Sequence, residues 1–304
     1  MQIKDLKAGD VLLFSAEKGS FISWAITFLT NAPVSHAAMF YDPQNGTIIE
    51  ETPPRVAINN AATRFPNRTI YVNRLDGALP MDPVVNAATH YLNNDEPYDS
   101  QGLYIVGLLL IYRKFTPRDR TQKAIIKILK KLTASITDYL HKHKTPGKKP
   151  MVCSQFVAQC FEDAGAGYRL QLHNPVLNDM ANRNLLSRAM EQFSDNIPND
   201  AFTLSAMHDV QEDDEALCRE LKEALEAEQG MTTNSDFLDP ELINVIAQFA
   251  AVNERAEAPY DANRPPQLNG TAMARLQTNL SMYVFPGDLL SHCKNLKQIG
   301  KVEI

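Results

Sequence analysis

The stretch SHAAMFYDPQNGTIIEE, residues 35–51, decides the fold that we expect for this chain. Two runs of strand-forming residues flank the turn sequence PQNG at residues 43–46, which is the pattern of a β-hairpin. Two more stretches have the character of strands, the apolar run DVLLF at residues 10–14 and the alternating TIYVNRL at residues 69–75. The sequence therefore predicts a small sheet built around the hairpin.

Helical patterns surround these strands. Residues 21–29 and 82–92 have helical spacing, and Ser20 and Asp82 are predicted to cap them. A further strong helix is predicted at residues 151–164, which are followed by Gly165. The segment at 178–279 is also mostly helical in character.

A local change in charge indicates an insertion. Residues 113–149 contain twelve Lys or Arg and only two Asp, and they follow the apolar run GLYIVGLLLIY at 102–112. One interpretation of segment 102–149 is a helical hairpin that buries its Leu and Ile and exposes its lysines. The other is a surface that rests on an anionic membrane. The acidic stretch at 209–228 is either a solvated helix face or a partner for this basic segment.

Composition excludes several classes of protein. The chain has 304 residues, 30 Lys and Arg, 36 Asp and Glu, and a formal net charge of −6. A nucleic-acid partner is not expected, because binding a phosphate backbone requires a basic excess. Four cysteines are too few for a disulfide framework. The sequence starts without the pattern of a signal peptide and has no apolar run long enough to span a bilayer. A cytoplasmic protein is therefore expected as encoded, and export by a signal-less route is left open.

Cys153 is the first candidate for chemistry. It lies in the first turn of the helix predicted at 151–164, where the helix end stabilises a thiolate. The alternative is a core residue, because Phe156, Val157 and Cys160 continue the same apolar face. Position alone leaves both interpretations open.

His36 is the second candidate, and the hairpin brings two carboxylates back toward it. A carboxylate beside an imidazole can hold it in the tautomer that a general base needs. A two- or four-residue loop favours Glu51 on the face of His36, and a three- or five-residue loop favours Glu50. Spacing therefore leaves Glu50 and Glu51 as alternatives.

Six short motifs occur in a characteristic order. They are GDVLLFS at 9–15, SHAAMFYD at 35–42, IIEETPPRV at 48–56, EPYD at 96–99, MVCSQFVAQCFEDAG at 151–165 and FPGDLLSHCKNLKQIGKV at 285–302. This order resembles the YiiX-like permuted papain-like amidases of the NlpC superfamily, in which the His-bearing strand precedes the Cys-bearing helix. The resemblance covers a little under half of the chain.

The resemblance implies an α+β fold, a circularly permuted papain-like (NlpC-type) one, in which a small antiparallel sheet packs on the Cys-bearing helix. The core would comprise residues 1–101, 150–177 and 280–304, with helical insertions at 102–149 and 178–279.

The resemblance also implies a catalytic triad. Cys153 matches the nucleophile, His36 the base and Glu50 the acidic residue, while Tyr98 of the YD motif would line the substrate pocket. No metal and no cofactor is called for. The function implied is a thiol hydrolase of the cysteine peptidase or amidase kind, acting on a peptide or other acyl-containing substrate. The alternatives are a lipid-directed acyl hydrolase or acyltransferase at a membrane surface, and a non-catalytic binding module.

Overall fold

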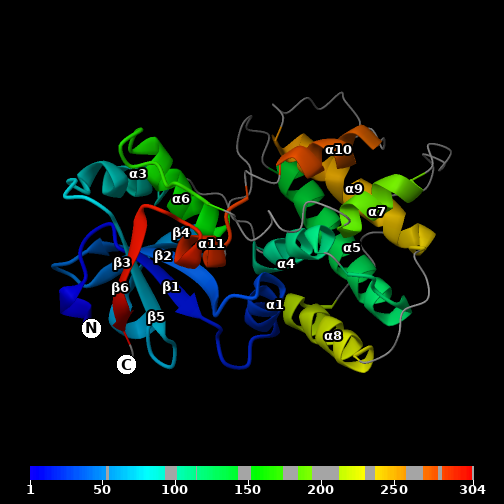
Figure 1. The fold of residues 1–304 in the computed structure, drawn as a ribbon, viewed down its shortest axis with the longest axis horizontal. Helices are drawn as coiled ribbons and strands as arrows, with labels where there is room; N and C mark the ends of the chain where they lie inside the picture. Colours follow the sequence, from blue (N-terminus) through cyan, green and yellow to red (C-terminus); the bar gives the residue numbers. More distant parts are fainter. Residues whose placement is uncertain are drawn as a thin grey trace. The chain divides into compact units, whose positions relative to one another are not determined.

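The computed structural model describes residues 1–52, 55–92, 101–113, 115–142, 152–173, 184–193, 212–229, 237–257, 270–279 and 283–302. The chain divides into two compact units (Figure 1). Unit 1 comprises Met1–Gly102, Met151–Val176 and Tyr283–Ile304, and unit 2 comprises Leu103–Pro150 and Leu177–Met282. The three segments of unit 1 end within a few residues of those expected for the core. The two expected insertions together form unit 2.

Unit 1 contains a six-stranded antiparallel sheet of strand order β4-β3-β2-β1-β5-β6. The strands are β1 (Val11–Ser15), β2 (Val34–Asp42), β3 (Thr47–Thr52), β4 (Arg55–Asn60), β5 (Ile70–Leu75) and β6 (Leu296–Val302). The predicted hairpin at 35–51 is confirmed as β2 and β3. The α+β class with an antiparallel sheet is likewise confirmed.

Both faces of the sheet are buried at its central strands β1 and β2. Phe14, Ala38 and Ile70 belong to one core cluster, which the short elements before β1 and after β4 help to cover. Their chain neighbours Leu13 and Met39 point to the opposite face and are also fully buried. Strand β1 is therefore apolar on both sides, which explains why it appears as an apolar run rather than as an alternating pattern.

Helices complete unit 1. They are the 3-10 helix η1 (Ile3–Asp5) and the α-helices α1 (Phe21–Thr30), α2 (Ala61–Arg64), α3 (Asp82–Leu92), α6 (Cys153–Asp163) and α11 (Pro286–Ser291). Helix α6 contacts β2, β3 and α3. Ser20 caps α1 as predicted, since its side chain accepts a hydrogen bond from the Ser23 backbone.

Unit 2 is built from helices in its described residues. They are α4 (Gln101–Tyr112, which begins at the boundary with unit 1), α5 (Asp119–Lys142), α7 (Leu185–Gln192), α8 (Asp214–Ala227), α9 (Pro240–Glu257) and α10 (Gly270–Thr278). Helix α5 packs against α8 and α9. The apolar run of α4 is buried from Leu103 to Tyr112. Among the described residues, no helix combines the length and the apolar character needed to cross a membrane.

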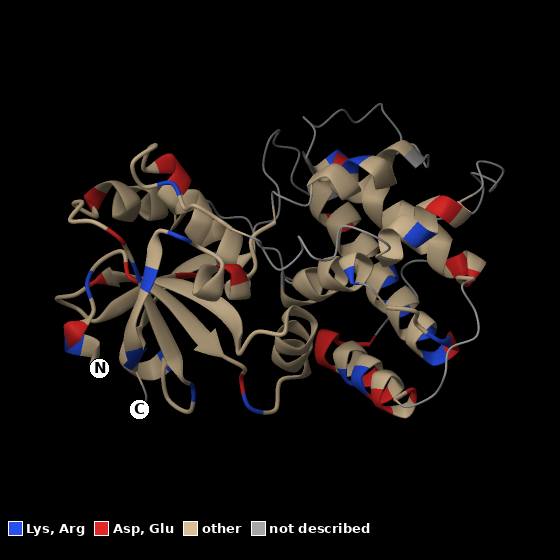
Figure 2. Ribbon diagram, viewed as in Figure 1, with Lys and Arg blue, Asp and Glu red and all other residues tan. Residues whose placement is uncertain are grey.

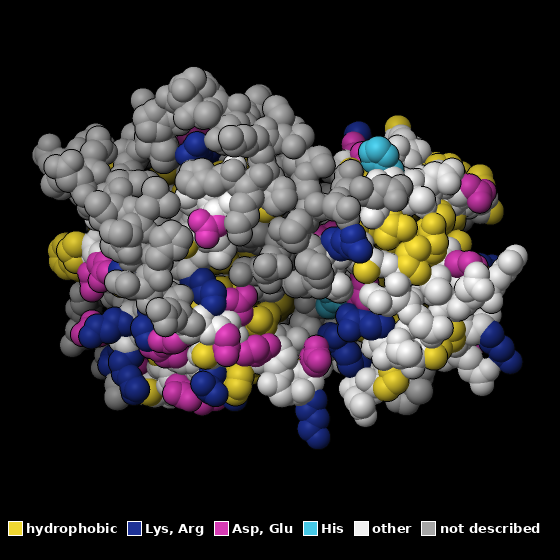
Figure 3. All heavy atoms as spheres, turned by 180° about the vertical axis from the view of Figure 1, so that it is seen from behind, with side chains coloured by type: hydrophobic (Ala, Val, Ile, Leu, Met, Phe, Trp, Pro, Cys, Tyr) yellow, Lys and Arg dark blue, Asp and Glu magenta, His cyan; other side chains and the backbone are white. Residues whose placement is uncertain are grey.

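The acidic helix α8 docks on the basic helix α5. Lys127 forms ion pairs with Glu212 and Glu220, and Lys131 pairs with Asp214 at 3.1 Å. Acidic and basic side chains are consequently intermixed on this part of unit 2 rather than gathered in a basic patch (Figures 2 and 3). Of the two interpretations of the acidic stretch, the structure shows the docked one.

Candidate active site

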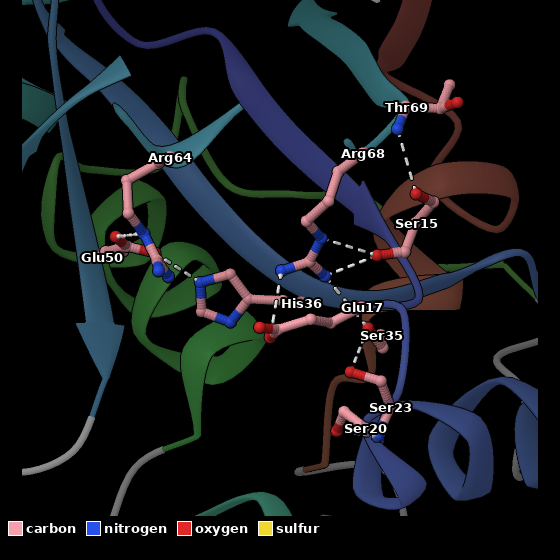
Figure 4. A network of polar contacts seen from close by, with 10 residues as sticks. All are labelled: Ser15, Glu17, Ser20, Ser23, Ser35, His36, Glu50, Arg64, Arg68 and Thr69. Carbon is pink, nitrogen blue, oxygen red and sulfur yellow. Dashed lines mark hydrogen bonds and ion pairs between the residues drawn. The ribbon is translucent and has the colours of Figure 1, made fainter. Parts of the chain in front are cut away.

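His36 lies near the start of β2, where it pairs with Phe14 of β1. Its side chain is 16% exposed, and its ring makes an edge contact with the Phe14 ring at a centroid distance of 5.4 Å. The Nε2 atom lies 2.7 Å from Oε2 of Glu50 (Figure 4). The imidazole is thus held at one nitrogen by a carboxylate and along its ring by an aromatic side chain.

The register of the β2–β3 hairpin determines which glutamate meets His36. Met39 pairs with Ile49 and Phe40 with Ile48, whereas Asp42 pairs with Thr47, so β2 has an extra residue between the last two pairs. Because neighbouring residues point to opposite faces, this register places Glu50 on the face of His36 and Glu51 on the other. Of the two alternatives that the loop length left open, the structure brings Glu50 to His36.

Glu50 is completely buried and surrounded by donors. Oε1 accepts hydrogen bonds from Asn59 Nδ2 at 2.8 Å and Arg64 Nε at 2.7 Å, and Oε2 accepts one from Arg64 Nη2 at 3.1 Å. Burial alone would raise the pKa of the carboxyl, but the hydrogen bonds and charges of His36 and Arg64 outweigh it and lower this pKa to about 2. Glu50 is therefore an anion at all ordinary pH values, which fixes the proton of His36 on Nε2.

Cys153 is the first residue of α6, and its side chain is buried. The next residue, Ser154, donates a 2.6 Å hydrogen bond from Oγ to the carbonyl of Val284 and so anchors the first turn of the helix. Phe156, Val157 and Cys160 are fully buried along the same helix. The helix therefore buries an apolar face and still presents Cys153 at its N-terminal end.

His36 and Cys153 interact electrostatically. Burial lowers the pKa of His36, but the negative charge and hydrogen bonding of Cys153, followed by those of Glu50, outweigh it and raise this pKa to about 9. The imidazole thus lies between Cys153 and the anionic Glu50. With Nε2 facing Glu50, Nδ1 is the nitrogen left to exchange a proton with Cys153.

Sequence reasoning missed three residues of this network, Asn59, Arg64 and Arg68. Asn59 and Arg64 hold Glu50, and Arg68 lies beside His36, where its guanidinium is 5.1 Å from the Phe14 ring centroid (Figure 4). Asn59 lies in β4, Arg64 ends α2 and Arg68 lies just before β5, and none of these segments has a recognisable motif. Only the register of the sheet could have shown that these residues lie on the face of the sheet that carries His36.

The remaining predictions for the site have different outcomes. Tyr98 lies outside the described residues. Cys160 and Cys218 are buried, with the pKa of each thiol raised first by burial, and the pKa of the half-buried Cys293 is also raised by burial. Among the residues that the structure describes, no three His, Cys, Asp or Glu side chains cluster as they would to hold a metal ion. Cys153 is the cysteine that interacts with His36.

Two comparisons with known proteins found no match for this chain. No protein-family model matches this chain, and no curated protein matches it. Its family therefore stays a prediction from the order of its motifs. The case for a function depends on the geometry of Cys153, His36 and Glu50.

Proposed function

We propose that this chain is a thiol hydrolase of the amidase or peptidase kind, with Cys153 as nucleophile, His36 as general base and acid, and Glu50 as the residue that orients His36. The observation that carries the proposal is the 2.7 Å contact between His36 and a fully buried Glu50, in a site where Cys153 raises the pKa of the same imidazole. A nucleophile, a base and a group that orients the base are the three parts that this chemistry needs.

We further propose that unit 1 has a circularly permuted papain-like fold. Its sheet contributes His36 and Glu50 first, from β2 and β3, and the helix with Cys153 follows later in the chain. The antiparallel sheet and the contact of α6 with β2 and β3 support this fold. The family resemblance of the motifs supports it independently of the contacts.

In the acylation step, the proton of Cys153 already lies on His36 Nδ1, and the Cys153 thiolate attacks the carbonyl carbon of the substrate. The backbone N–H groups in the first turn of α6 have no intrahelical acceptor, so they can stabilise the negative oxygen that forms. The imidazolium then gives its proton to the leaving amine or alcohol as the bond to the carbonyl carbon breaks. A thioester on Cys153 remains.

In the deacylation step, His36 accepts a proton from water, and the hydroxide attacks the thioester. Collapse of the intermediate releases the carboxylic acid and returns the thiolate, and the imidazolium is again paired with Glu50. Another acceptor in place of water would make the protein an acyltransferase by the same first step. Capture of the acyl group by added amines or lysolipids distinguishes the two.

Between the substrate classes, we propose an amide or peptide rather than a lipid. A lipid-directed enzyme would use the lysines of segment 102–149 to approach an anionic membrane. In the described part of that segment, Lys127, Lys130 and Lys131 form ion pairs with carboxylates of unit 2. These charges are thus largely satisfied within the protein.

The test is alkylation of each cysteine by iodoacetamide, followed by mass spectrometry across a range of pH. We expect Cys153 to react selectively at neutral pH, because it interacts with His36 whereas burial raises the pKa of the other three thiols, and His36→Ala to slow this reaction about tenfold or more. His90→Ala is the matched control, since His90 is an exposed histidine of α3.

Two results would argue against the enzyme. The first is that Cys153 does not react in the folded protein, and the second is that it reacts equally fast in His36→Ala. Either result would favour the non-catalytic binding module. A slow reaction in both histidine variants would instead point to loss of folding, which circular dichroism of the same samples detects.

A further inference from the structure

Arg68 is a cation beside the proposed catalytic residues that the reaction described above does not use. Its side chain is 10% exposed. The neighbouring Arg64 is fully engaged by Glu50 through two hydrogen bonds, so its charge is matched by a buried carboxylate. Arg68 has no such close carboxylate among the described residues.

The contacts of Arg68 hold the guanidinium in one orientation. Nε and Nη2 both donate to the carbonyl of Ser15, and Nη2 also donates to Ser35 Oγ at 3.2 Å. The plane lies over the ring of Phe14, which in turn contacts His36. One edge of the guanidinium is therefore bound to the protein, and the arginine has little freedom to turn.

A chain of serines supports this orientation. Ser35 donates from Oγ to Ser23 Oγ at 3.2 Å, and Ser20 accepts from the Ser23 backbone at the start of α1 (Figure 4). Ser15 is further fixed by its Oγ, which accepts from the Thr69 backbone at 3.0 Å. Such supporting contacts are typical of a side chain that is held ready for a ligand.

The remaining nitrogen, Nη1, faces Glu17. The closest approach is 3.9 Å to Oε2, which is too long for a hydrogen bond, and the Glu17 side chain is 65% exposed. An ion pair of this length with an exposed partner contributes little free energy and is easily displaced. The two N–H groups of Nη1 make no hydrogen bond within the described part of the chain.

Arg68 is also within electrostatic reach of the nucleophile. Burial lowers the pKa of Arg68, and the negative charges of Glu17 and Cys153 oppose this shift. Phe14 contacts both Arg68 and His36, so a carboxylate that replaced Glu17 at Nη1 would lie close to the imidazole that serves Cys153. Arginine is the residue best suited to such a group, because its fork of donors matches a carboxylate.

We propose that Arg68 is the anion-binding residue of this site. Its Nη1 binds a carboxylate that the substrate carries close to the scissile carbonyl, and this carboxylate takes the place that Glu17 approaches in this structure. This inference rests on the proposed function. It makes the substrate class an acidic one, with a carboxylate next to the amide that is cleaved. Arg68 then determines specificity, whereas His36 and Glu50 perform the proton transfer.

Two alkylating reagents that differ mainly in charge test the proposal. Iodoacetate carries a carboxylate, and iodoacetamide carries a neutral amide in the same position. The measured quantity is the ratio of the two rate constants for Cys153. We expect Arg68→Gln to lower the ratio of iodoacetate to iodoacetamide about fivefold, and Glu17→Gln to raise it, since that variant removes the competing anion.

Lys18→Gln is the matched control, because Lys18 is an exposed cation next to Glu17 and its loss changes the net charge by the same amount. Its ratio should stay near that of the parent protein. Glu17→Gln alters an exposed residue, so it tests the proposal even if Arg68→Gln fails to fold.

Three outcomes would overturn the anion site. The first is an unchanged ratio in Arg68→Gln, and the second is a fall of both rate constants by the same factor in that variant. The third is a fall of the ratio in Lys18→Gln as large as that in Arg68→Gln. The proposed function fails in a different way, since Cys153 would then be inert toward iodoacetamide in the parent protein.

Discussion

His36 and Glu50 are 14 residues apart in the chain, and their side chains are joined by a 2.7 Å contact across the β2–β3 hairpin. The contact is one of several that the carboxylate makes, since Arg64 and Asn59 approach Glu50 from the other side. The imidazole is therefore attached to a rigid and fully buried anion. Its orientation depends on the sheet rather than on a loop.

Replacing Glu50 by Gln should weaken both catalysis and folding. The amide cannot balance the charges of Arg64 and a protonated His36, so we expect the free energy of unfolding to fall by about 3 kcal/mol. The rate of Cys153 alkylation at neutral pH, or of turnover once a substrate is known, should fall about 100-fold. Chemical denaturation and the alkylation assay measure the two effects separately.

Glu51→Gln provides the comparison for this prediction. Glu51 is buried on the opposite face of the sheet, so its loss also removes a buried carboxylate. We expect it to leave the behaviour of His36 intact. An equal loss of Cys153 reactivity in both variants would show that Glu50 acts only through stability.

The titration of His36 should depend on Cys153. In the parent protein the imidazole stays protonated up to a pKa of about 9, because the thiolate and Glu50 hold its proton. Cys153→Ser removes the thiolate, so the pKa of His36 should move down. Nitrogen chemical shifts of the imidazole, followed against pH by NMR, give both values. A pKa that is the same in the two proteins would exclude an ion pair between Cys153 and His36.

The same pair should make stability depend on pH. The pKa of His36 is higher in the folded state than its ordinary 6.5, so its contribution is complete below pH 6.5 and is lost as pH rises through about 9. The pKa of Glu50 is lowered to about 2, so its contribution is present above about pH 4.5 and is lost as pH falls toward 2. Unfolding free energies between pH 6 and pH 10 should decline in the parent protein and decline less in Cys153→Ser.

Ser154 should matter for the position of Cys153. Its buried hydroxyl donates to the Val284 carbonyl, so Ser154→Ala leaves a buried acceptor without its donor and should cost about 1–3 kcal/mol. We also expect slower Cys153 alkylation, because the first turn of α6 loses its anchor. Ser187→Ala, which removes a hydroxyl that bonds within α7, is the control and should not change the Cys153 rate. Unaltered alkylation in Ser154→Ala would mean that other contacts hold this turn.

The lysines of α5 should stabilise unit 2 rather than bind membranes. We expect Lys127→Ala together with Lys131→Ala to lower the stability of unit 2 by about 1 kcal/mol, since these half-exposed pairs are individually weak. Sedimentation with vesicles rich in phosphatidylserine should leave the parent protein in the supernatant at physiological salt. Binding to these vesicles that is lost in the double variant would revive the lipid-directed alternative.

Much of unit 1 could be predicted from local sequence, because its signals are local. The apolar run of β1, the alternating pattern of β5, the PQNG turn and the Ser20 cap all lie within a few residues of the structure that they predict. The position of Cys153 at a helix N-terminus was also visible, since Pro150 and Gly165 bracket the helix.

The choice between Glu50 and Glu51 could not be made from loop length. The turn between Asp42 and Thr47 has the four residues that favour Glu51, and the extra residue in β2 reverses this preference. A bulge has no dependable sequence signal, since it depends on how the strand packs. The pairing of Arg64 with Glu50, and the docking of α8 on α5, are likewise tertiary contacts that no local pattern encodes.

The division of unit 1 into three chain segments has a consequence for how the protein is made. Strand β6 pairs with β5 although more than two hundred residues separate them in the chain, and the segment around Val284 anchors Cys153. During synthesis, the pairing of β6 with β5 and the contact of α6 with Val284 can therefore form only after residues 283–302 have been made. We expect nascent chains that lack residues 283–302 to have an unreactive Cys153, so that cysteine reactivity would be acquired only once these residues have been made.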